Sequence, residues 1–393
     1  MKHYINNILF LWACVFVQSC SSDQNKNADY NGLGNYESIY YKIDPEEMNS
    51  PLEADEYTVD SIRSLKSSDV QSEFEEDKFY VYNNKIYILD SNVAKTVMVF
   101  DICGNYLYKL GERGRAKNEY PYAPTDFFVA RNGNVHVFDM DGRRILIFDN
   151  NGKFVRTIGT SIINSFGMTT NEKYLYCIDN MYISDDESDP SLLIYDSKSD
   201  KKNCMIPSKH FTYHYYPRFR TFFYNDARLC HVPILADSII VFKDDQVEKV
   251  VHFDFKNGFL AKERPECVRD NKNNHSNTCY DDFNEVEAID EYQESDYYIY
   301  MRYIHKGYLK RWFYNHELRH GLKLFAGLNV FNDYQLKGNQ VIAYVGKENV
   351  EMLKEYCESE ECDTNEYKKT PLHVKSFYRR KITAPALVYI TIK

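Results

Sequence analysis

The sequence predicts an all-β fold built from repeated short strands, on three observations. Of the 393 residues 16% are aromatic, including 35 Tyr and 24 Phe, and aromatic side chains favour the half-buried surface of a sheet. Short apolar runs recur between turn signals along most of the chain, which is typical of strands. One group of these runs is repeated after about fifty residues, and a fixed period of this size indicates a repeat fold.

The repeat is clearest in two segments that match position by position. Residues 85–90, 97–101 and 106–111 match residues 134–139, 145–149 and 154–159. The spacing is 49 positions from Asp90 to Asp139 and 48 from Gly104 to Gly152. Each unit contains an Asp-x-x-Gly turn, in which Gly supplies the positive φ of a tight hairpin. We therefore predict a four-stranded antiparallel meander with the length of a β-propeller blade.

Weaker copies continue the pattern and predict six blades. They are residues 173–179 with 191–196, then 228–231, 238–242 and 249–253, then 297–304, 308–314 and 318–324, and finally 333–337, 340–345 and 386–393. The last copy lacks an outer strand, which residues 59–65 can supply. The prediction is a six-bladed β-propeller of four-stranded antiparallel blades, closed by pairing of the N- and C-terminal strands, because closure removes exposed sheet edges.

Two interruptions of the pattern predict inserts, helical or irregular, near residues 256–284 and 347–370. The second includes a helical-looking stretch at residues 349–357. We therefore expect a short helical insert in the last blade.

The first 35 residues are typical of an export signal and a tether. A basic start precedes an apolar run at residues 8–17, which has the length of a signal-peptide core and about half that of a membrane span. The run ends at a site that resembles the bacterial lipobox, where Ser19 and Cys20 match and Gln18 departs. We expect a signal peptide at 1–19, a flexible tether lipidated at Cys20 over 20–35, and the propeller at 36–393. The alternative is an ordinary secretory signal with a chance Cys.

From residue 36 to residue 393 the chain resembles the bacterial six-bladed β-propeller lipoproteins, relatives of the NHL-repeat propellers. Residues 109–120 are similar to that family's connector, K-I-G-x-x-G-x-G-P-G-E-Y. The matching residues are Gly111, Gly114, Glu119 and Tyr120, whereas Ala116, Lys117 and Asn118 replace the usual Gly-Pro-Gly. The resemblance implies propeller architecture and export, and it implies no particular ligand or reaction.

Loops at one end of a propeller surround its channel, and they are the candidate ligand-binding elements. They are residues 112–120, 139–144 and 180–190, joined by a Tyr-rich segment at 211–220 that offers rings for stacking on sugars. The candidate ligand-binding residues are Arg113, Arg115, Tyr120, Arg143, Arg144, Tyr182, Tyr215 and Arg218. The alternatives are a solvated, charged rim for the loops and a strand edge packed on the next blade for the Tyr-rich segment.

No catalytic or metal-ligating residue is predicted. The sequence has no paired Cys-x-x-Cys units and no Gly-x-Ser-x-Gly motif, which zinc sites and serine hydrolases use. Export permits disulfides, and the candidates are Cys267–Cys279 and Cys357–Cys362. We expect no cofactor, with calcium in the channel left open.

Histidine and aspartate recur at equivalent blade positions. His136 and His231 occupy comparable places on second strands, and we interpret them as core residues rather than metal ligands. Asp90, Asp139 and Asp179 recur at one place in the repeat, and we expect them to cap turns.

The net charge of −10 provides no basic field for nucleic acid. We predict a non-catalytic binding or scaffolding module in the bacterial cell envelope, an outer-membrane lipoprotein facing the periplasm or the cell surface. Its partner is a small molecule, a glycan, a peptide or another envelope protein, its membrane contact is the lipid anchor alone, and the protein is a monomer. The alternative is a metal-dependent hydrolase or lyase with its site at the central channel.

Overall fold

The computed structural model describes a part of the chain with several gaps. The described residues are 35–46, 57–66, 76–159, 165–168, 174–177, 190–196, 201–207, 222–225, 228–233, 236–244, 246–264, 284–316, 320–322, 333–346, 349 and 385–392. The sheets belong to one compact unit, Leu33–Lys393. Among the described residues no helix is both long and apolar enough to cross a bilayer.

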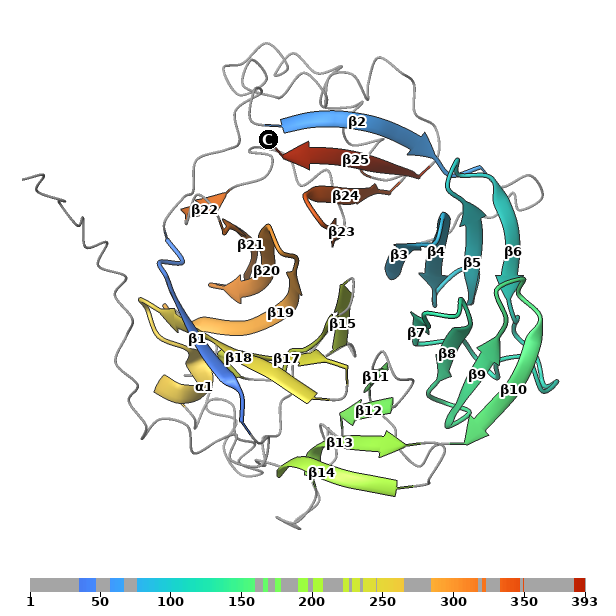
Figure 1. Cartoon of the computed structure of the whole chain (residues 1–393), viewed down its shortest axis with the longest axis horizontal. Coiled ribbons are helices and arrows are strands. Elements are labelled where there is room, and N and C mark those ends of the chain that lie inside the picture. The colour runs from blue at the N-terminus through green and yellow to red at the C-terminus, as the bar shows by residue number, and fades with distance from the viewer. Residues whose placement is uncertain are drawn as a thin grey trace, which may run out of the picture. The chain divides into compact units, whose positions relative to one another are not determined.

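Five sheets in the described part of the chain are four-stranded antiparallel blades. From the inside outward they are β3 (Lys78–Tyr82), β4 (Lys85–Asp90), β5 (Thr96–Asp101) and β6 (Tyr106–Leu110); β7 (Asp126–Val129), β8 (Val135–Asp139), β9 (Arg144–Phe148) and β10 (Phe154–Gly159); β11 (Ser165–Met168), β12 (Tyr174–Cys177), β13 (Pro190–Asp196) and β14 (Lys201–Pro207); β19 (Val286–Glu294), β20 (Tyr298–His305), β21 (Tyr308–Asn315) and β22 (His320–Leu322); and β23 (Asp333–Lys337), β24 (Gln340–Val345), β25 (Ala386–Ile392) and β2 (Tyr57–Ser64). They are arranged around a common centre (Figure 1).

The expectation of six four-stranded antiparallel blades is wrong, because five sheets are of this kind. The sheet between the third and fourth of them has five strands and is mixed. It consists of β15 (Phe222–Asn225), β16 (Arg228–His231), β17 (Ser238–Lys243), β18 (Gln246–Phe255) and β1 (Glu37–Ile43). Strand β1 pairs with β18 in parallel, from Glu37 opposite Lys249 to Ile43 opposite Phe255.

The expected helical insert in the last blade lies outside the described residues except for residue 349, which is helical. Of residues 347–370 only residue 349 is described. The helix that the structure does define, α1 (Leu260–Glu263), is one turn long and follows β18. It lies within the other predicted insert, at 256–284. The fold is therefore almost entirely β.

The predicted pairing of distant terminal strands is confirmed. Strand β2 pairs antiparallel with β25, from Tyr57 opposite Ile392 to Ser64 opposite Ala386, with one register shift between Val59 and Ser61. The blade that contains them is therefore built from both ends of the chain. This pairing gives the outer part of the blade a strand that the local repeat does not supply.

The hairpins of the first two blades form as the repeat predicts. The Asp101 carboxylate accepts hydrogen bonds from the backbone N–H groups of residues 103 and 105, at 2.9 and 2.8 Å. Gly104 has φ +86°, and a Cβ there would approach the Ser64 carbonyl oxygen to 2.3 Å. Asp149 and Gly152 repeat this arrangement one blade later. The turn residues therefore set the register of the outer strand pairs.

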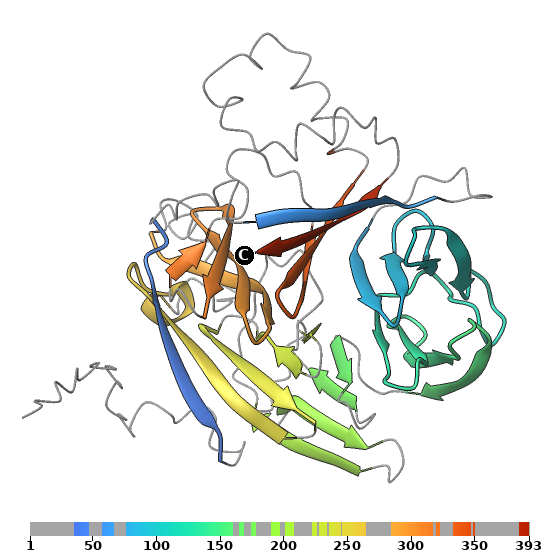
Figure 2. The same ribbon diagram turned by 45° about the horizontal axis from the view of Figure 1, so that its top comes forward.

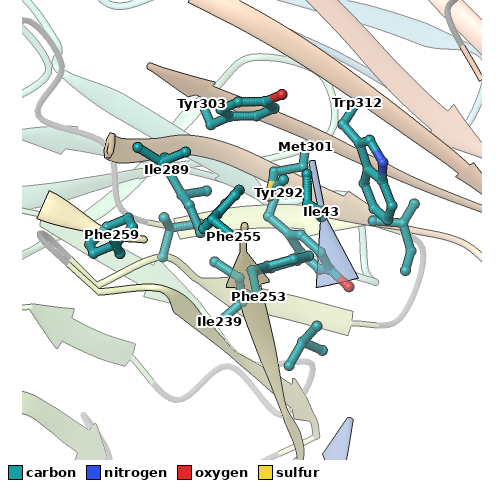
Figure 3. Close-up of a cluster of buried hydrophobic side chains, with 14 of the residues drawn as sticks. Ile43, Ile239, Phe253, Phe255, Phe259, Ile289, Tyr292, Met301, Tyr303 and Trp312 are labelled. Carbon is teal, nitrogen blue, oxygen red and sulfur yellow. The ribbon is translucent and has the colours of Figure 1, made fainter. Parts of the chain in front are cut away.

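The core lies between adjacent sheets rather than within one of them. Figure 3 shows the cluster between the mixed sheet and the blade that begins with β19. Phe253 and Phe255 from β18 meet Tyr292 from β19 and Tyr303 from β20, with ring centroids about 6 Å apart. Because each sheet buries both faces in this way, its central strands are almost continuously apolar.

Strand β1 fastens the mixed sheet to its neighbour. The Tyr41 ring lies 5.8 Å from the ring of Trp312 and 5.1 Å from that of Tyr314, both on β21. Beyond the strand, the Asp44 carboxylate pairs with Lys256 at 2.5 Å and the Glu46 carboxylate pairs with Lys306 at 2.5 Å. Figure 2 shows β1 running along β18 on the outside of the sheet.

Candidate functional site: the central cavity and the connector face

The innermost strands enclose a small cavity at the centre. Residues of β3, β7, β15, β19 and β23 line it. The volume open to the centres of water molecules is about 40 Å³, which is room for a few waters. Small-molecule sites in proteins bury most of their ligand and are an order of magnitude larger.

Aromatic side chains fill much of the centre. The aromatic lining residues are Phe79, Tyr80, Phe127, Phe128, Phe222, Phe223, Tyr224 and Tyr334. The Tyr224 ring comes from the mixed sheet and contacts the rings of Tyr80 and Phe128 edge-on, each at 6.2 Å. These two rings belong to the first and second blades, so Tyr224 reaches across the centre.

Two glutamine side chains join the inner strands of adjacent blades. Gln293 of β19 donates from Nε2 to the Tyr334 carbonyl at 2.5 Å, and its Oε1 accepts from the Leu336 N–H at 3.0 Å. Gln335 of β23 accepts from the Val81 N–H at 2.7 Å and donates to the Val81 carbonyl at 3.2 Å. Each primary amide thus binds an N–H and a C=O of the next inner strand, as a neighbouring strand would.

A lysine makes the third bridge in this series. Lys78 of β3 donates to the Asp126 carboxylate at 2.6 Å and to the Phe127 carbonyl at 2.8 Å, both on β7. Its ammonium lies 4.2 Å from the centroid of the Phe128 ring, a cation–π geometry. We call the contacts of Gln293, Gln335 and Lys78 the inter-blade bridges. They link four consecutive blades in space, from β19 through β23 and β3 to β7.

The carboxylates at the cavity face a buried arginine. Arg302 of β20 is 0% exposed. Its guanidinium lies 2.5 Å from Asp290 Oδ2, 3.1 Å from Glu291 Oε2 and 3.9 Å from Asp333 Oδ1. Glu291 also accepts from Gln293 at 2.7 Å. These carboxylates are therefore held by protein groups.

The loops of the first two blades share one end of the strands. Because successive strands run antiparallel, the connector that enters an inner strand lies at the same end as the turn between the second and third strands. Three segments of the first two blades lie there: residues 91–95, 111–125 and 140–143. We call this surface the connector face.

The recurring aspartates of this face cap turns. Asp90 is fully buried and accepts from the backbone N–H groups of residues 92, 93 and 94 at 2.7–2.9 Å. Asp139 accepts from the Gly142 N–H at 2.9 Å and from Arg144 Nε at 2.8 Å. The expectation that Asp90 and Asp139 cap turns is confirmed, and Asp179 lies outside the described residues.

The predicted ligand-binding residues of the first two blades occupy different depths on this face. Arg113, Arg115 and Arg143 are exposed. Arg144 is half-buried, where its guanidinium donates to the Glu119 carbonyl at 2.5 Å and joins the turn to the connector. Tyr120 is 0% exposed and its hydroxyl donates to the Leu110 carbonyl. Burial raises the pKa of Tyr120 well above its ordinary value.

The other sequence-predicted positions lie outside the described residues. They are Tyr182, Tyr215, Arg218, Cys20 and the pairs Cys267–Cys279 and Cys357–Cys362. Their roles stay predictions.

One exposed aromatic residue of the connector face was missed from the sequence. The Tyr122 side chain is 62% exposed, and it lies between Pro121 and Pro124. The available signal was its place in a Pro-rich connector, where an exposed ring has no core position to fill.

The two histidines are core residues, as expected. His136 and His231 are each 2% exposed, and the ring of His231 stacks on that of Phe222 at 4.6 Å. Burial, with a smaller effect of Arg156, lowers the pKa of His136 to about 4. Within the described ranges no group of three His, Cys, Asp or Glu side chains has a metal-binding arrangement.

A comparison with known families found a match. A family model described as a domain of unknown function, DUF4934, matches residues 75–378. The chain belongs to the DUF4934 family. No curated protein matches this DUF4934 chain.

Two solved structures from Bacteroides are similar to this DUF4934 chain. A candidate exported protein of Bacteroides fragilis superposes with a TM-score of 0.68 at 15% identity, covering 91% of this chain and 99% of that one. A DUF4221 family member from Bacteroides vulgatus gives a TM-score of 0.49 at 12% identity, covering 87% and 99%. At this identity the first likeness shows the fold alone.

Proposed function

We propose that this DUF4934 chain is an exported, lipid-anchored propeller that acts as a non-catalytic binding or scaffolding module. Its ligand, a glycan or a peptide, binds on the connector face and not inside the ring. The observation that carries the proposal is the filled centre, where aromatic rings and the inter-blade bridges leave about 40 Å³ for water. A ligand larger than a few waters would have to displace these groups.

The connector face supports the second half of the proposal. There Arg113, Arg115 and Arg143 extend into solvent, and the Tyr122 ring is largely exposed. Loops held on a rigid scaffold are the usual place for binding residues. In this protein the scaffold is held by the Asp90 and Asp139 turns and by the contact of Arg144 with the connector.

The direct test is a glycan and peptide array probed with the purified exported protein, together with elemental analysis of protein prepared without chelators. We expect a bound ligand class and no stoichiometric metal. A calcium or zinc ion retained at one per chain would contradict the non-catalytic proposal and favour a metal-dependent hydrolase or lyase.

The anchoring part of the proposal has its own test. Cys20 comes three positions after the end of the apolar run and has a small residue, Ser19, before it. Cys20→Ala is expected to abolish palmitate labelling and to release the protein from membranes, with Cys14→Ala as the matched control. Normal labelling of the Cys20 variant would contradict lipidation at this residue.

A further inference from the structure

Contacts join the loops of the first two blades into one continuous surface. The Ser91 hydroxyl, in the loop after β4, donates to the Pro124 carbonyl of the connector at 2.7 Å. Five positions earlier in the connector, the Glu119 carbonyl accepts a hydrogen bond from the Arg144 guanidinium at 2.5 Å. The backbone of Gly114 and Tyr120 closes the connector on itself at 2.8 Å. The connector face is therefore tied at several points to both blades.

This surface is locally cationic on an acidic protein. Its three segments, residues 91–95, 111–125 and 140–143, carry five basic and three acidic side chains, a local charge of +2, whereas the chain carries −10. One of these acids, Glu112, is paired with Lys109 at 2.5 Å, and at the edge of the surface Asp139 is paired with Arg144 at 2.8 Å.

The exposed cations that remain have no ion-pair partner among the described residues. They are Arg113, Arg115, Lys117 and Arg143. The Glu119 carboxylate beside them accepts the Ala116 N–H at 2.8 Å, so it is held by the connector's own backbone. An anionic ligand would supply carboxylate or sulfate oxygens to these cations, and each arginine guanidinium can bind two such oxygens at once.

Tyr122 adds a flat apolar surface next to these charges. Its ring is 62% exposed, and the neighbouring Pro121 and Pro124 restrict the backbone on both sides. An aromatic face is electron-rich, so it attracts the C–H groups on one side of a sugar ring. Because the backbone is already restricted on both sides, binding removes little main-chain freedom here, and a Tyr ring has only two χ angles to order.

The same surface lacks what peptide recognition uses. Peptides bind by adding to a sheet edge or by placing apolar side chains in a groove. The connector face presents strand ends and turns, and its exposed large apolar side chains among the described residues are Val93 and Tyr122. A sugar chain with anionic groups requires only stacking and charged hydrogen bonds.

We infer that the connector face of the first two blades binds an acidic glycan, a sugar chain bearing carboxylate or sulfate groups, with Tyr122 stacking on a sugar ring and Arg113, Arg115 and Arg143 binding its anionic groups. This inference rests on the proposed binding function and names its ligand class.

The test is titration of the full chain with four polymers: polygalacturonate, dextran sulfate, neutral dextran and poly-glutamate. We expect binding to polygalacturonate, dextran sulfate or both, which separates carboxylate from sulfate recognition, and no binding to dextran. Raising the salt concentration should weaken binding, because screening shortens the range of the attraction.

Variants locate the site. Arg113→Ala, Arg143→Ala and Tyr122→Ala should each weaken binding about tenfold, the usual effect of one lost charged hydrogen bond or stacked ring. Tyr122→Phe should bind like wild type, because it keeps the ring. The matched controls, Arg131→Ala and Tyr297→Ala, lie on hairpins at the opposite end of the strands and should have no effect.

The failures of the two proposals are distinguishable. If poly-glutamate binds as tightly as the acidic polysaccharides and Tyr122→Ala does not weaken its binding, the site recognises acidic peptides. This result would overturn the glycan inference and leave the proposed binding function standing. Dextran binding would overturn the acidic class in the same way. Acidic-glycan binding that survives every connector-face variant would overturn the location. Binding to none of the four polymers overturns the glycan inference, and blank glycan and peptide arrays would overturn the proposed function as well.

Discussion

Replacement of Gln335 by Ala tests whether the inter-blade bridges stabilise the ring. The substitution removes both partners of the Val81 backbone, whose N–H and C=O are bound at 2.7 and 3.2 Å in a residue that is 2% exposed. A buried polar group left without a partner costs roughly 1–3 kcal/mol, so the two together cost about 2–6 kcal/mol.

This loss corresponds to a measurable change in the melting temperature. A unit of roughly 360 residues has an unfolding entropy near 0.75 kcal/mol per kelvin, at about 2.1 cal/mol/K per residue. The expected decrease in Tm for Gln335→Ala is therefore about 3–8 °C. Differential scanning calorimetry of the wild type and the variant in the same buffer measures it directly.

The matched control is Gln340→Ala, five positions further along the chain. Gln340 donates to Asp60 at 2.8 Å on the exposed surface, and loss of an exposed bond costs less than about 0.5 kcal/mol. Its Tm should therefore stay within about 1 °C of wild type. If Gln335→Ala has the same Tm as Gln340→Ala, the reasoning is refuted. Water would then bind the Val81 N–H and C=O as well as the glutamine does.

Three further predictions concern closure, pH and the N-terminal strand. Deleting residues 386–393 removes four buried side chains, those of Leu387, Val388, Ile390 and Ile392. At about 1.5–3 kcal/mol each, the loss is comparable to the whole free energy of unfolding of a domain, so calorimetry of the deletion variant should show no cooperative transition. A melt like that of the wild type would mean that closure is dispensable. Because the pKa of His136 falls from 6.5 in the unfolded chain to about 4 in the fold, the unfolded state binds more protons between these values. The free energy of unfolding should therefore decrease as pH falls from about 6.5 to about 4, by about 3 kcal/mol in total. Urea unfolding measured across this range should show a weaker pH dependence of that free energy for His136→Leu. The same pH dependence in the variant and the wild type would show that His136 is not its cause. Tyr41→Ala should cost roughly 2 kcal/mol of local stability, seen as faster hydrogen exchange in β1 with no change in β8; equal exchange would show that backbone pairing alone holds the strand.

The fold was predictable where the determinants are local. The Asp101 and Asp149 turns and the apolar strands between them follow from short-range chemistry, and a fixed period makes them visible in one sequence. The closure of residues 59–65 on 386–392 was predictable for a different reason, because one copy lacked an outer strand and another segment was left over.

The mixed sheet was not predictable in this way. Residues 37–43 read as an ordinary strand, and nothing local shows that Glu37 lies opposite Lys249 in parallel. A parallel partner more than two hundred positions away leaves no hairpin signal. The prediction of uniform four-stranded antiparallel blades was wrong for this reason.

The candidate site was predictable only in outline. The sequence placed the basic residues of the connector on a loop, but it did not show how deeply each side chain is buried. Arg113 and Tyr120 belong to the same motif, and only Tyr120 is buried. The roles of Gln293 and Gln335 were invisible, since a glutamine on an inner strand becomes a bridge only through the distance to the next blade. Tyr122 was missed because its place between two prolines is a weak signal, which does not by itself separate an exposed ring from a buried one such as that of Tyr120.

The parallel pairing of β1 with β18 determines how the protein responds to pulling. When the chain before Glu37 is pulled against a load at the C-terminal end of β18, the force acts along the strand axis, and the seven residue pairs with β18 share the load at the same time instead of opening one after another. The Tyr41 ring lies within the same strand, and the Asp44 and Glu46 ion pairs follow directly after it. A protein attached through its N-terminus to a moving surface would thus transmit tension into two adjacent sheets, and its resistance to detachment would be set by the rate of strand slippage.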